Sequence, residues 1–148
     1  MPVARTLSPS SVRAARDVRV VVSRLRRRLV DLAETHELTP SQLSVLSRLG
    51  KEGPASASDL AAAERIRPQS VAATLAVLEE RGLVVRRQDP ADGRRQLVSL
   101  SRDGTALFDD RRRHSEEWLS RALEERLTEA ERQTVIEAAA LLERLTRQ

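Results

Sequence analysis

Apolar residues recur at spacings of three and four near the start of the chain. Val18, Val22, Leu25, Leu29 and Leu32 fall on one face of a helix, while arginine fills most of the other positions. This periodicity predicts an amphipathic helix over residues 11–35. Its apolar stripe requires a partner surface.

A second helix start lies at Thr39. This residue, Pro40 and Gln42 form a capping box with proline at the first helical position. The apolar pattern then continues to Gly50, where we expect the helix to end. The polar residues 51–54 predict a turn.

Two shorter helices follow this turn. Ser56 and Asp59 have the spacing of another capping box, so they predict a short helix. Pro68 opens the next helix, which runs to about Arg81 and ends at Gly82 because glycine suits the left-handed residue after a helix. Its inward-facing residues are expected to be Val71, Leu75 and Leu78.

The pattern then changes to β-type. Residues 83–87 and 96–100 are strand-like and flank a loop that contains aspartate, proline and glycine, which predicts a β-hairpin. Ser101 caps a further helix to about Arg126, and a capping box at Thr128 opens the last helix. The face of that helix carries Val135, Ala138, Leu142 and Leu145.

The order of these elements predicts a mostly α fold with a small β-hairpin wing. Two capped helices joined by a tight turn and followed by a hairpin form a winged helix-turn-helix, which we place at residues 39–100. Residues 1–38 and 101–148 supply a helical dimerisation platform. Pairing their apolar stripes between two copies removes both from water, and packing within one chain is the alternative.

Composition and charge narrow the function further. The 148 residues include 26 basic and 22 acidic side chains, with no cysteine. Residues 1–30 and 65–102 are basic, whereas 31–64 and 103–148 are acidic. Clustered arginine suits a polyanion, although solvated helix faces would give the same pattern. We expect a cytoplasmic protein without a membrane segment or secretion signal.

Four residues of the helix that opens at Pro68, or of its entrance, are candidates to contact DNA. Gln69, Ser70 and Thr74 are expected on the side opposite its apolar residues. Glutamine can bond adenine through two hydrogen bonds, and serine or threonine can bond bases or phosphates. Arg67, at the entrance, could reach a guanine or a phosphate.

The hairpin loop supplies the remaining candidates: Asp92, Arg94 and Arg95. An arginine at the tip of a wing can enter a narrow minor groove, where negative potential is concentrated. Asp92 could extend the Arg94 guanidinium through a bidentate pair. A solvated Asp-Gly turn is the alternative interpretation of the same tripeptide.

The segment LAAAERIRPQSVAATLAVLEERGLVVRRQDPADGRRQLVSLSRDG resembles the signature region of the MarR family of bacterial regulators. The match includes G-L-V-x-R, D-P-x-D-x-R and V-x-L-S-x-x-G. The resemblance implies a homodimer on a pseudo-palindromic double-stranded DNA operator, acting more often as a repressor than an activator. It also implies Arg94 as the wing arginine and Asp92 as its acidic partner. Arg67 departs from the pattern, since Ser, Thr or Asp is usual there.

Many members of that family release DNA on binding a small, often anionic aromatic effector. The sequence does not locate such a site: Phe108 and Trp118 are expected in the core, and His36 and His114 on the surface. No metal, cofactor or catalytic constellation is predicted, so we do not expect an enzyme.

A winged helix used as a protein-interaction module, without specific DNA binding, is the alternative function. The polar row Gln69, Ser70 and Thr74 favours DNA, because a protein interface would usually present an aromatic or aliphatic anchor there.

Overall fold

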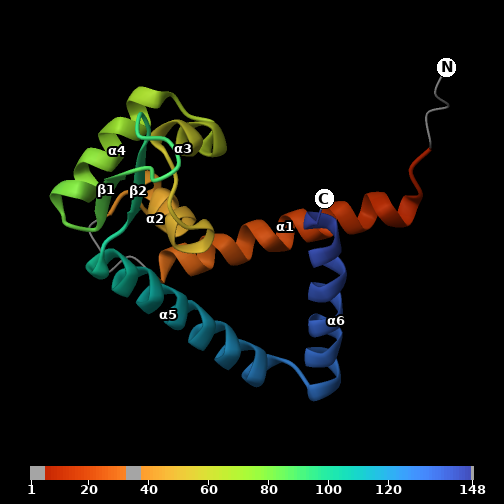
Figure 1. The fold of residues 1–148 in the computed structure, drawn as a ribbon. Coiled ribbons are helices and arrows are strands. Elements are labelled where there is room, and N and C mark those ends of the chain that lie inside the picture. The colour runs from red at the N-terminus through yellow and green to blue at the C-terminus, as the bar shows by residue number, and fades with distance from the viewer. Residues whose placement is uncertain (1–5, 33–37, 148) are drawn as a thin grey trace. The chain divides into compact units, whose positions relative to one another are not determined.

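The computed structural model describes residues 6–32 and 38–147, which belong to two compact units, 1–37 and 38–148. The first unit contains α1 (Pro9–Asp31). The second contains, in chain order (Figure 1), α2 (Pro40–Glu52), α3 (Ala57–Glu64), α4 (Pro68–Glu80), β1 (Val84–Gln88), β2 (Gln96–Leu100), α5 (Arg102–Arg126) and α6 (Glu129–Thr146). The predicted mostly α fold with one small hairpin is confirmed. The winged helix-turn-helix comprises α2 to β2.

The predicted helix starts are confirmed by their caps. The side chains of Thr39, Ser56 and Thr128 each accept the N–H of the third helical residue, and each box is closed by the reciprocal bond. Ser101 caps α5 in the same way, accepting the Gly104 N–H at 3.0 Å. α1 begins at Pro9 with Ser8 as its cap, two residues before the predicted start, and its predicted end at Thr35 lies outside the described residues.

The predicted end of α2 at Gly50 is wrong. The helix continues through Lys51 and Glu52, and Gly53 terminates it with a φ of 86°. Gly50 has a different purpose, because a Cβ there would lie 2.5 Å from the ring of Phe108 in α5. The glycine lets an aromatic ring pack directly on the helix, and the sequence pattern alone does not separate this from a stop signal.

The core lies among α2, α3, α4 and the hairpin. Leu60, Val71, Leu75 and Leu78 are fully buried, which confirms the predicted inner face of α4. Val98 joins the hairpin to this core: it is 1% exposed, and its N–H and carbonyl both bond to Ala55 at 2.8 and 3.0 Å. The segment that leads into α3 is therefore hydrogen-bonded to β2. β1 and β2 are antiparallel, and their register places Arg86 opposite Val98.

A partly buried polar cluster fixes α2 to α3. Glu64, at the end of α3, accepts hydrogen bonds from Arg48 Nε and the Ser44 hydroxyl, both at 2.6 Å. Arg48 also bonds Glu52 at 2.9 Å. These contacts raise the pKa of Arg48, Glu64 contributing most. No local sequence pattern indicates this cluster, because the bonded residues of the two helices are 16 and 20 positions apart.

The joint between α4, the hairpin and α5 is tightly packed. Gly82 has a φ of 70°, and the Leu83 N–H bonds back to the Leu78 carbonyl at 2.9 Å, so the predicted left-handed helix end is confirmed. A Cβ on Gly104 would lie 1.9 Å from the Leu83 carbonyl oxygen. The first turn of α5 therefore fits against the start of β1 only with glycine at 104.

The predicted boundary at residue 101 is not a break in packing. Leu107 and Phe108 of α5 pack against the core of the lobe, as expected of Phe108, and Trp118 is half-buried. Beyond them α5 leads away from the lobe to α6 (Figure 1), which has no buried residue. α1 has none either. No described helix is long and apolar enough to cross a membrane.

Gly104→Ala tests the joint. Alanine has the higher helix propensity by about 1 kcal/mol, so propensity alone predicts stabilisation. The clash with the Leu83 carbonyl instead predicts a loss of about 2–3 kcal/mol in the free energy of unfolding, measured by urea denaturation. As control, Gly93→Ala places its Cβ 3.7 Å from the nearest side-chain atom and should change this free energy by no more than about 0.5 kcal/mol. Equal stability of the two variants would contradict the described packing.

Glu64→Gln tests the polar cluster. It removes the charge that pairs with Arg48 in a site where the Glu64 side chain is 15% exposed, so we expect a loss of about 1–2 kcal/mol in the free energy of unfolding. Glu52→Gln is matched, because Glu52 pairs with the same arginine but is 62% exposed; its effect should be about 0.5 kcal/mol or less. The reverse order would show that the α2–α3 contact does not depend on Glu64.

Candidate nucleic-acid interface

The outer side of α4 is polar and free of bulky residues. Gln69 and Ser70 are exposed, as are Ala72 and Ala73. Thr74 differs from the expectation: it is half-buried, and its hydroxyl donates to the Ser70 carbonyl at 3.0 Å. Thr74 therefore lies at the edge of the predicted face rather than opposite the core. Its hydroxyl hydrogen is already used within the helix.

The entrance of α4 carries cations in place of a capping side chain. Arg67 makes no side-chain cap bond, and its carbonyl accepts the N–H groups of Ser70 and Val71 at 2.9 and 3.2 Å. Arg65 ends α3 in the left-handed conformation, with a φ of 53°. Both arginines are exposed. Two exposed arginines at the entrance of a helix favour an anion near its N-terminus.

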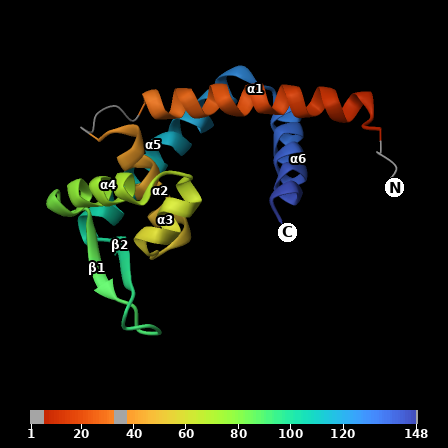
Figure 2. The same ribbon diagram turned by 90° about the horizontal axis from the view of Figure 1, so that it is seen from above.

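Backbone bonds from two aspartates shape the wing tip. Asp89 Oδ1 accepts the Ala91 N–H at 2.9 Å, and Asp92 Oδ1 accepts the Arg94 N–H at 3.0 Å. The Asp89 N–H donates to the Arg95 carbonyl at 2.8 Å and closes the loop. Both aspartates thus act as turn residues. Figure 2 shows the tip projecting from the lobe on the side away from α5.

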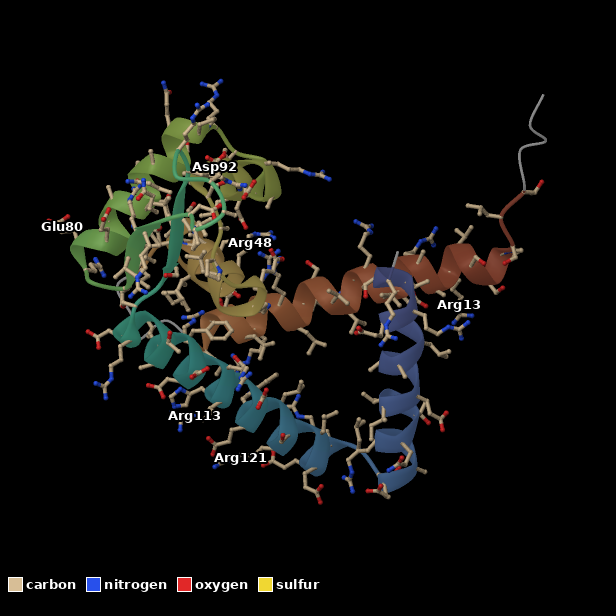
Figure 3. All side chains as sticks on the ribbon, viewed as in Figure 1. Arg13, Arg48, Glu80, Asp92, Arg113 and Arg121 are labelled. Carbon is tan, nitrogen blue, oxygen red and sulfur yellow. The ribbon has the colours of Figure 1, made fainter. Side chains whose placement is uncertain are left out.

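The predicted ion pair between Asp92 and Arg94 is not formed among the described residues. A carboxylate two residues before an arginine reaches its backbone N–H more easily than its distant guanidinium. Asp92 is labelled in Figure 3 at the tip. Within the described chain, the guanidinium of Arg94 has no protein partner and is exposed.

Arg95 is placed differently from its neighbour. Its Nη2 bonds the carboxylate of Asp59 and donates to the Ser56 hydroxyl at 3.0 Å, so the side chain turns back to the start of α3. The sequence pattern predicts that Arg95 contacts DNA together with Arg94. The partner lies 36 residues earlier in the chain, and no local pattern could have indicated the pairing.

Electrostatics distinguish the two ends of α4. Arginines 65 and 67 lie at its start, whereas Glu79 and Glu80 lie at its end; Glu79 accepts a hydrogen bond from Arg86 of β1 at 3.0 Å.

Among the described residues no group of three or more His, Cys, Asp or Glu side chains is arranged to hold a metal ion. His114 is exposed as expected, and His36 lies outside the described residues.

Comparisons with known proteins agree with this geometry. The sequence model described as "MarR family" matches residues 36–95. An uncharacterised HTH-type transcriptional regulator of Mycobacterium bovis is 38% identical over 133 residues, which is 90% of this chain and 92% of that protein. A further one, from Mycobacterium leprae, is 40% identical over 110 residues, or 74% of this chain and 77% of that one.

Solved structures show the same fold over nearly the whole chain. A putative transcriptional regulator from Pseudomonas aeruginosa PA01 superposes with a TM-score of 0.81 at 38% identity, covering 96% of this chain and 99% of that one. A MarR family protein from Bacillus stearothermophilus gives a TM-score of 0.78 at 18% identity, with coverage of 96% and 100%. This chain belongs to the MarR family of HTH-type transcriptional regulators.

Proposed function

We propose that the protein is a cytoplasmic repressor that binds a pseudo-palindromic operator as a homodimer. The observation that carries this proposal is the arrangement of two exposed DNA-complementary features on one core: the outer side of α4 with Gln69 and Ser70, and the wing tip with Arg94. An HTH-type transcriptional repressor of Bacillus subtilis, MdtR, is 26% identical over 63% of this chain and 60% of its own length, which supports repression as the mode of action.

The two features suit the two grooves of DNA. α4 has small or polar residues outside and Val71, Leu75 and Leu78 inside, so its outer side can enter a major groove while the inner side stays packed. Gln69 is suited to adenine, and Arg67 to a phosphate or guanine at the helix entrance. The free guanidinium of Arg94 is suited to a narrow minor groove beside the major-groove contact.

Dimerisation is supported by the apolar surfaces of the terminal helices. In α6, Ile136, Leu141 and Leu145 are 60, 58 and 80% exposed. In α1, Val21 and Val22 are 52 and 53% exposed. Surfaces of this kind mark interfaces, and a twofold dimer gives each operator half-site one recognition helix.

Release of DNA by a small anionic or aromatic effector is part of the proposal and rests on the family alone. The alternative, a protein-interaction module, is disfavoured by the composition of the α4 outer side. The exposed residues of its first two turns are Pro68, polar residues and alanines, without an aromatic or branched aliphatic anchor.

Selection of bound sequences from random duplex DNA tests the proposed function. We expect an inverted repeat whose half-sites lie about one helical turn, 10 base pairs, apart, because one recognition helix of a dimer reads each half-site. Recovery of no preferred sequence at physiological salt, together with capture of a protein partner through α4, would favour the interaction module instead.

The dimer is tested by Leu141→Glu combined with Leu145→Glu. Burying two carboxylates in an apolar interface costs several kcal/mol, so sedimentation equilibrium should show a monomer where the wild type is a dimer. Glu137→Gln, in the same helix, serves as the control and should remain dimeric. A wild-type monomer at micromolar concentration, or an unchanged dimer in the double variant, would remove α6 from the interface.

A further inference from the structure

Residues that sequence reasoning treats alike, Arg94 and Arg95, have different surroundings in the structure. Arg94 presents a free guanidinium, whereas Arg95 bonds both Asp59 and Ser56 at the start of α3. We propose that Arg95 is a positioning residue, not a DNA contact: it ties the wing to α3 and so fixes the place from which Arg94 reaches DNA.

We call the bonds of Arg95 to Ser56 and Asp59 the tether. The segment to which it attaches is itself held by hydrogen bonds. Ser56 is 4% exposed and caps α3 by accepting the Asp59 N–H at 3.1 Å, while Asp59 accepts the Ser56 N–H at 3.4 Å. Immediately before it, Ala55 forms a two-bond bridge with Val98 of β2. Arg95 therefore bonds to a point that is already joined to the core and to the second strand of the wing.

At the wing, the backbone of Arg95 is also held by hydrogen bonds. Arg95 directly precedes β2, and its backbone carbonyl accepts the Asp89 N–H while its own N–H donates to the Asp92 carbonyl at 3.0 Å. A single residue thus closes the tip loop through its backbone and attaches that loop to α3 through its side chain. Losing the side-chain bonds loosens the tip, because its other hydrogen bonds among the described residues join residues of the hairpin to one another.

Arg94 and Arg95 also differ in whether a carboxylate of the protein compensates their charge. The Arg95 cation is compensated within the protein by Asp59, whose pKa is lowered chiefly by its hydrogen bond with Ser56 and further by Arg95. Arg94 has no such compensation among the described residues. Neutralising a phosphate releases counterions, so an uncompensated arginine that contacts DNA contributes to the salt dependence of binding, whereas a compensated one does not.

Asp59→Asn discriminates most sharply between the two roles. Asparagine keeps an oxygen that can accept the Ser56 N–H, so the α3 cap survives. If Arg95 contacted DNA, removing the nearby carboxylate would free its cation and strengthen binding. A positioning role predicts the opposite: weaker binding to the operator obtained by selection, by about three- to tenfold.

The full experiment measures operator affinity against salt for Arg94→Ala, Arg95→Gln, Asp59→Asn and the Arg95→Gln/Asp59→Asn pair. Arg94→Ala should lower the slope of log K against log salt by about 1. Arg95→Gln and Asp59→Asn should each lower affinity with that slope unchanged, and the pair should be no weaker than either alone. Arg113→Gln removes a comparable exposed ion pair with Asp110 in α5, away from the wing tip (Figure 3), and should match the wild type.

Amide hydrogen exchange of the free protein tests the tether without DNA. The Asp89 and Arg95 amides close the tip loop, and their exchange should accelerate about threefold or more in Arg95→Gln and Asp59→Asn but not in Arg94→Ala or Arg113→Gln. The inference rests on the proposed DNA binding only for its effect on affinity. The exchange measurement uses no DNA, so it tests the tether separately from the proposed function. A wild type without a preferred DNA sequence would overturn the proposed function alone.

Three results would overturn the tether: unchanged tip exchange in Arg95→Gln, tighter operator binding by Asp59→Asn, or a fall in salt slope in Arg95→Gln equal to that in Arg94→Ala. The last result would return Arg95 to the residues that contact DNA.

Discussion

The hydrogen-bonded bridge between Ala55 and Val98 is the contact on which the arrangement of the lobe depends. Val98 is buried in the common core, and its backbone bonds the segment that leads into α3. A wing formed by a two-stranded hairpin alone is marginally stable in water. Joined to α3 by this bridge and covered by the core, the hairpin becomes part of the same body as the helix-turn-helix.

Two further contacts join α3 to neighbouring elements of the lobe. The Arg48–Glu64 contact fixes α2 to the end of α3, while Arg95 fixes the wing to its beginning. α3 is only eight residues long, too short to be stable alone, yet each end is bonded to a neighbouring element. This short helix is thereby bonded both to α2, which precedes it, and to the wing, which folds back onto it.

Local signals in the sequence were sufficient for most of the fold. Capping boxes and prolines gave the helix starts, because caps depend on residues three apart. Gly82 indicates the end of α4, because glycine suits the left-handed residue that follows a helix. The prediction that α2 ends at Gly50 is wrong, since glycine also allows close packing, and only the fold brings Phe108 onto it. The division of the chain into platform and lobe remains a prediction about function.

The sequence predicts the surroundings of the candidate site residues less completely than the helices and strands, because several of these residues depend on their hydrogen-bond partners. Gln69, Ser70 and Arg94 are exposed as their local pattern predicted, but contact of each with DNA remains a prediction. The roles of Thr74, Asp92 and Arg95 depended on hydrogen-bond partners: a carbonyl one turn earlier, a neighbouring N–H, and a carboxylate far along the chain. Hydrophobic periodicity carries no information about such partners.

If α4 and the wing bind DNA as one rigid unit, both grooves of the operator are occupied at the same protein concentration, which simultaneous footprinting can measure. Base protection in the major groove and hydroxyl-radical protection at the flanking minor groove would be titrated together on the selected operator. We expect one shared midpoint for the two protections. Minor-groove protection that is absent, or that appears only at a clearly higher protein concentration, would contradict it.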